Sequence, residues 1–139
     1  MKTYNEIIKQ KPVFLHHWGS KVSLLSDFED IGYCHDQYEK ELKTKIILNR
    51  YKDVNILFAS YSTDNYSGDA WVLFQQDGIL YEINGGHCSC YGLEGQWNPE
   101  QVTLDELKHR LLKGTFGVDD WTGNTFKNEL CEFLGVDKS

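Results

Sequence analysis

The middle of the chain lacks positive charge, because no Lys or Arg occurs between Lys52 and Lys108. The same interval holds nine acidic residues, more than the whole chain's formal net charge of -7. Such a stretch repels phosphate backbones and attracts basic protein surfaces, so we expect a protein partner and no direct nucleic-acid binding. The alternative is that the charge serves solubility alone. The nine residues are Asp53, Asp64, Asp69, Asp77, Glu82, Glu94, Glu100, Asp105 and Glu106.

The chain also lacks long apolar runs. No stretch approaches the length of a membrane span, and the first ten residues contain no apolar signal-peptide core. We therefore expect a cytoplasmic protein that does not bind membranes, with its four cysteines as thiols or metal ligands. A length of 139 residues, 40% of them hydrophobic, fits a single domain, 1–139, as a monomer or homodimer.

A β-hairpin is the clearest local prediction. Asp77-Gly78 is a preferred two-residue type I′ turn, because both positions need positive φ. This turn fixes the pairing of the flanking strands, and directly opposed residues share a face. The expected pairs are Gln76 with Ile79, Phe74 with Tyr81, and Val72 with Ile83. One face is then apolar, the other face carries Trp71 and Glu82, and Gly85-Gly86 is expected to end the second strand.

The remaining pattern predicts an α+β fold, a small antiparallel β-meander (56–62, 70–76 and 79–84) covered on one face by helices. The helices are expected at 36–50, 103–113 and 125–134. Residues 103–106 form a capping box, and so do residues 26–29, where a helical turn is expected to begin. In the helix at 36–50 an apolar stripe is expected to face inward, with charged residues outward. Its members are Tyr38, Leu42, Ile46 and Asn49, widened by Ile47 and Leu48.

A compact cluster follows the hairpin: His87, Cys88 and Cys90 supply three potential soft ligands within four residues. A structural zinc site needs four ligands, normally from two separated groups, so this cluster would need help from elsewhere in the chain. The other candidate ligands are Cys34, His35, Cys131, His16 and His17. In the alternative interpretation no cofactor is bound, and the two cysteines pack as small buried thiols.

The cluster also allows a thiol enzyme. Cys88 or Cys90 would be the nucleophile, with His87 or His109 as the base and glycine amides as oxyanion donors. However, acidic surroundings raise the pKa of a thiol and so disfavour the thiolate. The sequence therefore favours a protein that is not an enzyme, and a small metal- or thiol-dependent enzyme at this cluster is the alternative.

The run of residues 84–97, NGGHCSCYGLEGQW, and the hairpin before it resemble a group of short bacteriophage and prophage proteins. The resemblance covers about residues 61–112 and leaves the N-terminal third and the last helix unmatched. It implies a mobile-element protein that acts inside a bacterial host cell. Small acidic phage proteins of this kind are often inhibitors of host defence.

The function predicted from these observations is an acidic protein-binding module, an inhibitor of a bacterial defence effector such as a CRISPR nuclease. Acidic side chains would meet Arg and Lys of the effector's nucleic-acid-binding surface, and aromatic rings would anchor the contact. The expected contact residues are Asp64, Tyr66, Asp69, Tyr91, Glu94 and Trp97.

Overall fold

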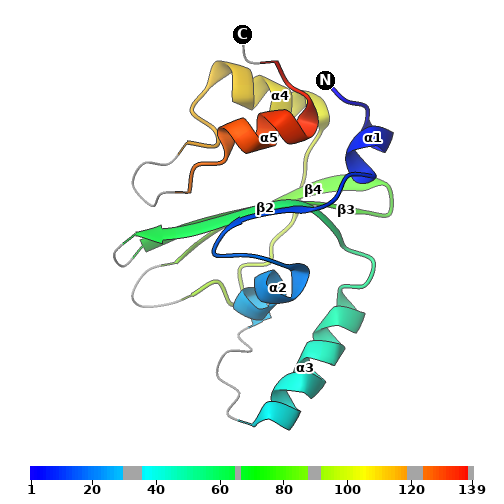
Figure 1. The fold of residues 1–139 in the computed structure, drawn as a ribbon, viewed down its shortest axis with the longest axis vertical. Coiled ribbons are helices and arrows are strands. Elements are labelled where there is room, and N and C mark those ends of the chain that lie inside the picture. The colour runs from blue at the N-terminus through cyan, green and yellow to red at the C-terminus, as the bar shows by residue number, and fades with distance from the viewer. Residues whose placement is uncertain (30–35, 65–66, 88–91, 119–123, 138–139) are drawn as a thin grey trace.

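A computed structural model describes residues 1–29, 36–64, 67–87, 92–118 and 124–137 (Figure 1). The strands in these ranges form one sheet with the order β1-β2-β3-β4-β5. β1 runs parallel to β2, and every other neighbouring pair is antiparallel. The fold is α+β, as predicted. The strands are β1 (Val13–His16), β2 (Asn55–Asp64), β3 (Ser67–Gln76), β4 (Ile79–His87) and β5 (Glu100–Gln101).

The predicted hairpin is confirmed in its register. Gln76 pairs with Ile79, and the predicted partners of Phe74 and Val72 are also correct. Asp77 and Gly78 both have positive φ, 54° and 80°, which is the conformation that a type I′ turn requires. The expectation that Gly85-Gly86 ends the strand is wrong, because β4 continues through both glycines to His87.

Helices cover both faces of the sheet (Figure 1), which corrects the expectation of a single covered face. On one face lie α1 (Tyr4–Ile8), α4 (Leu104–Lys113) and α5 (Lys127–Leu134). On the other lie α2 (Lys21–Glu29) and α3 (Gln37–Arg50). The three helices predicted from sequence all form, each within two residues of its expected start.

The hydrophobic core consists of two layers, one on each face of the sheet. Successive side chains of a strand point to opposite faces, so β3 contributes Trp71 and Leu73 to the layer under α4 and α5. It contributes Val72 and Phe74 to the layer under α2. This central strand is therefore apolar on both faces, and its sequence does not alternate between apolar and polar residues.

Two predictions about helices need correction. Residues 26–29 do not begin a helix but form the last turn of α2, where the Ser26 hydroxyl donates to the carbonyl of Val22 at 2.7 Å. In α3 only part of the predicted inward stripe faces the protein: Ile47 is buried and Leu48 packs against the core layer under α2. Tyr38, Leu42 and Ile46 point to solvent instead and are 73%, 47% and 50% exposed. Thr103 caps α4, since its Oγ1 accepts from the Glu106 amide at 3.1 Å. The second half of the predicted capping box differs, because the Glu106 carboxylate accepts from the Thr103 hydroxyl, at 3.2 Å.

No helix within the described ranges combines the length and the apolar character that a bilayer crossing requires.

Candidate functional site

The predicted contact residues whose side chains the structure describes, Asp69, Glu94 and Trp97, lie on both faces of one end of the sheet. Tyr66 and Tyr91 lie outside the described residues, and for Asp64 only the backbone, at the end of β2, is described. Asp69 lines a pocket beside Trp71, on the face covered by α4 and α5. Glu94 is exposed in the loop at 92–97 on the opposite face. The sheet therefore separates Asp69 from Glu94, although both lie near the same end of β4.

The 92–97 loop is fastened to β4 by one side chain. The Gln96 carboxamide accepts from the Gly86 amide at 2.8 Å and donates to the Gly86 carbonyl at 2.7 Å. The same amide nitrogen also donates to the Gly92 carbonyl at 2.7 Å. Both hydrogen-bonding groups of Gly86 that face away from β3 are thus satisfied by a side chain. This arrangement positions Glu94 at the surface.

Glycine lets the loop pack closely where it crosses β4. A Cβ on Gly85 would lie 3.2 Å from Leu93 Cδ2 and 3.4 Å from Gln96 Oε1, so both loop side chains would have to shift by about a few tenths of an ångström. Gly95 has a φ of 79°, the left-handed conformation that glycine adopts without strain. Gly85 and Gly95 therefore have a structural role in holding the loop close to the strand.

Trp97 anchors the end of the loop inside the protein. Its half-buried ring contacts Phe28 of α2 and Tyr51 at centroid distances of 5.2 Å each, and it stacks on Phe74 of β3 at 5.3 Å. The ring therefore packs into the core layer under α2, and only its exposed part is accessible to a partner. Trp97 fixes the loop that presents Glu94.

Replacing Gln96 by glutamate is expected to destabilise the loop by about 2 kcal/mol. The shape is unchanged, but a carboxylate cannot donate to the carbonyls of Gly86 and Gly92. Hydrogen exchange of the Gly86 and Leu93 amides should accelerate in this variant and slow again as the pH falls, because a protonated carboxyl regains one donor. Gln101→Glu, at an exposed position of β5, is the control and should change neither amide. Unaltered exchange in the Gln96 variant would contradict the role assigned to its carboxamide.

An acidic residue that sequence reasoning did not single out lies near Glu94. Asp27 of α2 accepts a hydrogen bond from Trp18 Nε1 at 2.7 Å, and it is exposed. Burial, followed by the charges of Asp27 and then Glu94, raises the pKa of Tyr61 from its ordinary 10.0 to about 12. Both carboxylates therefore act on the same tyrosine, although they are far apart in the sequence. Only the tertiary fold brings them together.

The tyrosines predict loss of stability in alkali. Burial, and then the hydrogen bond with Glu29, also raises the pKa of Tyr51 to about 12. In the unfolded chain both hydroxyls lose their protons near the ordinary value of 10.0, so above that pH the unfolded state binds fewer protons than the folded state. The stabilisation is complete below pH 10 and is lost as the pH rises through about 12.

Urea denaturation at several alkaline pH values measures this loss. The double variant Tyr51→Phe with Tyr61→Phe should show a shallower fall in the free energy of unfolding over the same interval. An equally steep fall in the double variant would show that other groups cause it.

The His and Cys cluster lies almost entirely outside the described residues. Cys88 and Cys90 belong to the part that is not described, and His87 is described only in its backbone, which pairs with Gly68. Of the other candidate ligands, Cys34 and His35 are also outside the described ranges. Among the residues that the structure describes, no three His, Cys, Asp or Glu side chains are grouped to hold a metal. Zinc binding and thiol chemistry at the cluster stay predictions.

The remaining described candidates, His16, His17 and Cys131, are placed in different surroundings. His16 Nε2 lies 3.2 Å from the Thr125 carbonyl, and His17 Nε2 lies 3.2 Å from Thr63 Oγ1. Cys131 is buried in the core layer under α5.

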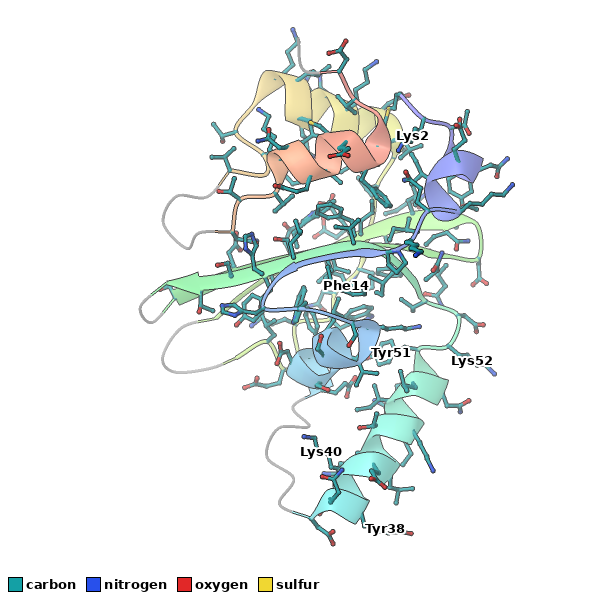
Figure 2. All side chains as sticks on the ribbon, in the orientation of Figure 1. Lys2, Phe14, Tyr38, Lys40, Tyr51 and Lys52 are labelled. Atoms are coloured by element: carbon teal, nitrogen blue, oxygen red, sulfur yellow. The ribbon has the colours of Figure 1, made fainter. Side chains whose placement is uncertain are left out.

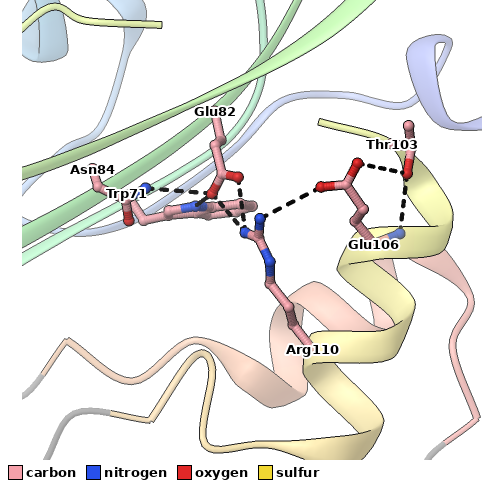
Figure 3. A network of polar contacts seen from close by, with 6 residues as sticks. All are labelled: Trp71, Glu82, Asn84, Thr103, Glu106 and Arg110. Atoms are coloured by element: carbon pink, nitrogen blue, oxygen red, sulfur yellow. Dashed lines mark hydrogen bonds and ion pairs between the residues drawn. The ribbon is translucent and has the colours of Figure 1, made fainter. Parts of the chain in front are cut away.

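An ion pair between a buried glutamate and a partly exposed arginine connects α4 to the sheet (Figure 3). The Glu82 side chain is only 4% exposed and lies 2.8 Å from Arg110 Nη1. It also accepts from Trp71 Nε1 at 3.0 Å and from Asn84 Nδ2 at 3.4 Å. Arg110 in turn lies 3.7 Å from Glu106. Trp71, Glu82 and Asn84 lie in strands, and Glu106 and Arg110 lie in α4. The network therefore fixes α4 on β4.

The network changes the interpretation of the acidic interval. Glu82 does not contribute to the surface charge, because it is buried and paired with an arginine from outside the interval. Most of the other acids are exposed, so the interval still presents negative charge to solvent. The exposed ones are Asp53, Asp77, Glu94, Glu100, Asp105 and Glu106.

Comparison with protein-family models, with curated proteins and with solved structures gives no match for this chain.

Proposed function

We propose that this chain is an acidic protein-binding module that covers a basic surface of a partner protein. The observation that carries the proposal is the distribution of charge: six exposed acids lie between residues 53 and 107, where the sequence has no Lys or Arg. A surface of one sign steers a partner of the opposite sign and suppresses contacts with phosphate backbones.

The proposed contact surface is the end of the sheet that carries Asp69 and Glu94, together with Asp27. The 92–97 loop is held there by the Gln96 carboxamide and the Trp97 ring, so Glu94 is presented from a fixed backbone. A fixed position lowers the conformational entropy that is lost on binding. Acids on both faces of the same sheet end would let a basic groove close around it.

The proposed partner is a bacterial defence effector with a basic nucleic-acid-binding groove, such as a CRISPR nuclease. The resemblance of residues 84–97 to bacteriophage proteins supports this choice, and so does the exposed negative charge. Occupation of the groove by acidic side chains would exclude the nucleic acid, which makes the chain an inhibitor that acts by competition inside the host cell.

The test is a plating assay in a bacterium whose CRISPR immunity is directed against an infecting phage. Expression of the chain should raise the plating efficiency of that phage. The double variant Asp69→Lys with Glu94→Lys should abolish the effect, because each substitution puts a cation where an anion met the partner. Asp53→Lys with Asp77→Lys is the matched control: it makes the same change in net charge at exposed positions near the opposite end of the sheet, and it should retain the effect.

Binding to the purified nuclease should weaken strongly when the salt concentration rises from about 50 mM to about 500 mM, because salt screens surface charges. Bound guide RNA or target DNA should compete with the chain. Equal loss of inhibition in both double variants would place the contact elsewhere, and binding that is independent of salt would overturn the electrostatic mechanism.

A further inference from the structure

The exposed face of α3 is apolar along its length. Tyr38, Leu42 and Ile46 are spaced four residues apart, so they lie on one side of the helix, and about half or more of each is exposed. Ile47 is the one buried residue of α3 and lies on the side toward the core layer under α2. A helix in a monomer normally directs its apolar stripe inward. In α3 the larger apolar stripe points outward.

The rest of the described chain gives α3 little support. Figure 2 shows Tyr38 at the end of α3 that lies away from the sheet, and Tyr51 at the opposite end beside α2. The contacts with α2 come from that second end, where Arg50 and Tyr51 bind Glu29. A helix of 14 residues is marginal in water without packing. Burial of this apolar face by a partner would therefore stabilise the outer half of α3.

We propose that this partner is α3 of a second copy of the chain, packed antiparallel across a two-fold axis. In this arrangement the Leu42 side chains of the two copies pack against each other at the axis, and Tyr38 of each copy packs against Ile46 of the other. The three exposed apolar side chains of each helix are then covered by the same three of its partner, as an isologous interface requires. This pairing is separate from the acidic sheet end and goes beyond the proposed function.

The charges beside the stripe favour the antiparallel direction. Glu41 and Lys45 are both exposed and lie four residues apart on the same flank of the stripe. In an antiparallel pair the same flanks face each other with reversed direction, so Glu41 of each copy meets Lys45 of the other. In a parallel two-fold pair this flank would instead face the other flank of the partner helix, which carries Glu39 and Lys43. The match of Glu41 with Lys45 of the second copy is thus available in the antiparallel direction only.

The interface is small. One helix from each copy covers less than the roughly 1,200–2,000 Å² of a standard stable interface, so the dimer should dissociate at micromolar concentrations. Sedimentation velocity of the full chain from about 1 μM to about 500 μM should show a monomer that converts to a dimer. The double variant Leu42→Glu with Ile46→Glu should stay monomeric over this range, while circular dichroism shows that the domain remains folded.

A charge exchange tests the direction of packing. Glu41→Lys alone and Lys45→Glu alone should each weaken the dimer about tenfold, because two ion pairs become two repulsive pairs. Mixing these two variants should restore dimers, since every contact between unlike chains again joins opposite charges. The double exchange within one chain should also dimerise like the original protein. Lys40→Glu, an exposed position outside this flank, is the control and should leave the dimer intact.

Each result decides the proposal. A chain that remains monomeric at the highest concentration would overturn it and would assign the face to a different partner. A dimer that survives Leu42→Glu with Ile46→Glu would place the self-association elsewhere. A dimer that those two substitutions abolish, but that mixing the charge variants does not restore, would refute the antiparallel pairing.

Discussion

Replacing Trp71 by alanine should lower the free energy of unfolding by about 4 kcal/mol, a large part of the roughly 5–15 kcal/mol that is typical of native proteins. Trp71 is 2% exposed. It stacks on Phe126 at 5.1 Å between ring centroids and contacts Phe116 edge-on at 5.2 Å. Its indole N–H also donates to the buried Glu82. The substitution therefore leaves a cavity and removes one of the donors that satisfy a buried carboxylate.

Urea denaturation followed by far-ultraviolet circular dichroism measures this loss without relying on tryptophan fluorescence. Trp97→Ala is the matched control, because it removes the same ring from the other core layer at a half-buried position. It should cost about 2 kcal/mol. Trp71→Phe should fall between the wild type and Trp71→Ala, since it retains the stacking but loses the hydrogen bond. A similar cost for both alanine variants would contradict the central role of the ring at 71.

Replacing Arg110 by methionine should cost about 3 kcal/mol, because it leaves the buried carboxylate of Glu82 without its cation. The stem of the side chain is retained, so the loss reports charge more than packing. Arg50→Met is a matched control: Arg50 also pairs with a glutamate, but this pair is exposed, with Arg50 at 57% and Glu29 at 25%. That variant should cost less than about 1 kcal/mol.

The double variant Arg110→Met with Glu82→Gln separates the contribution of the ion pair from the cost of burying an unpaired charge. An amide at position 82 still accepts from Trp71 Nε1 and carries no charge, so most of the stability lost in Arg110→Met should return. Chemical denaturation of the single and double variants forms a double-mutant cycle. Additive costs would show that the two side chains act independently, contrary to the 2.8 Å contact between them.

The hairpin could be predicted to the residue because its information is local. Asp77-Gly78 specifies the turn, and alternation of side chains then fixes every pair out to Gly85. The cap at Thr103 was equally local. Glu82 was the opposite case, because nothing near it in the sequence shows that Arg110 will lie beside it. The i,i+4 spacing of Glu106 and Arg110 indicated that these two side chains lie on one face of a helix. It did not indicate which strand that face covers.

The errors at α3 and β4 also have physical causes. Helical periodicity shows that Tyr38, Leu42 and Ile46 share a side, but it does not show which side faces the protein. Paired glycines commonly end a strand, yet Gly85-Gly86 continue β4 by pairing with β3, and the missing Cβ of Gly85 leaves room for Leu93 and Gln96. For the site, exposure of Glu94 could be expected, whereas the division of Asp69 and Glu94 between opposite faces depended on the path of the 92–97 loop.

The Gln96 carboxamide also has a consequence for the strand edge that it covers. An open strand edge recruits strands from other chains, which leads to amyloid-like stacking. β5 pairs with the outer edge of β4 at Tyr81 and Glu82. At Gly86 the Gln96 side chain occupies the backbone amide and carbonyl of the same edge. At the other edge of the sheet, the four residues of β1 follow Lys11 and Pro12, both poor templates for strand addition. The sheet is thus protected against runaway growth, and association is left to side chains.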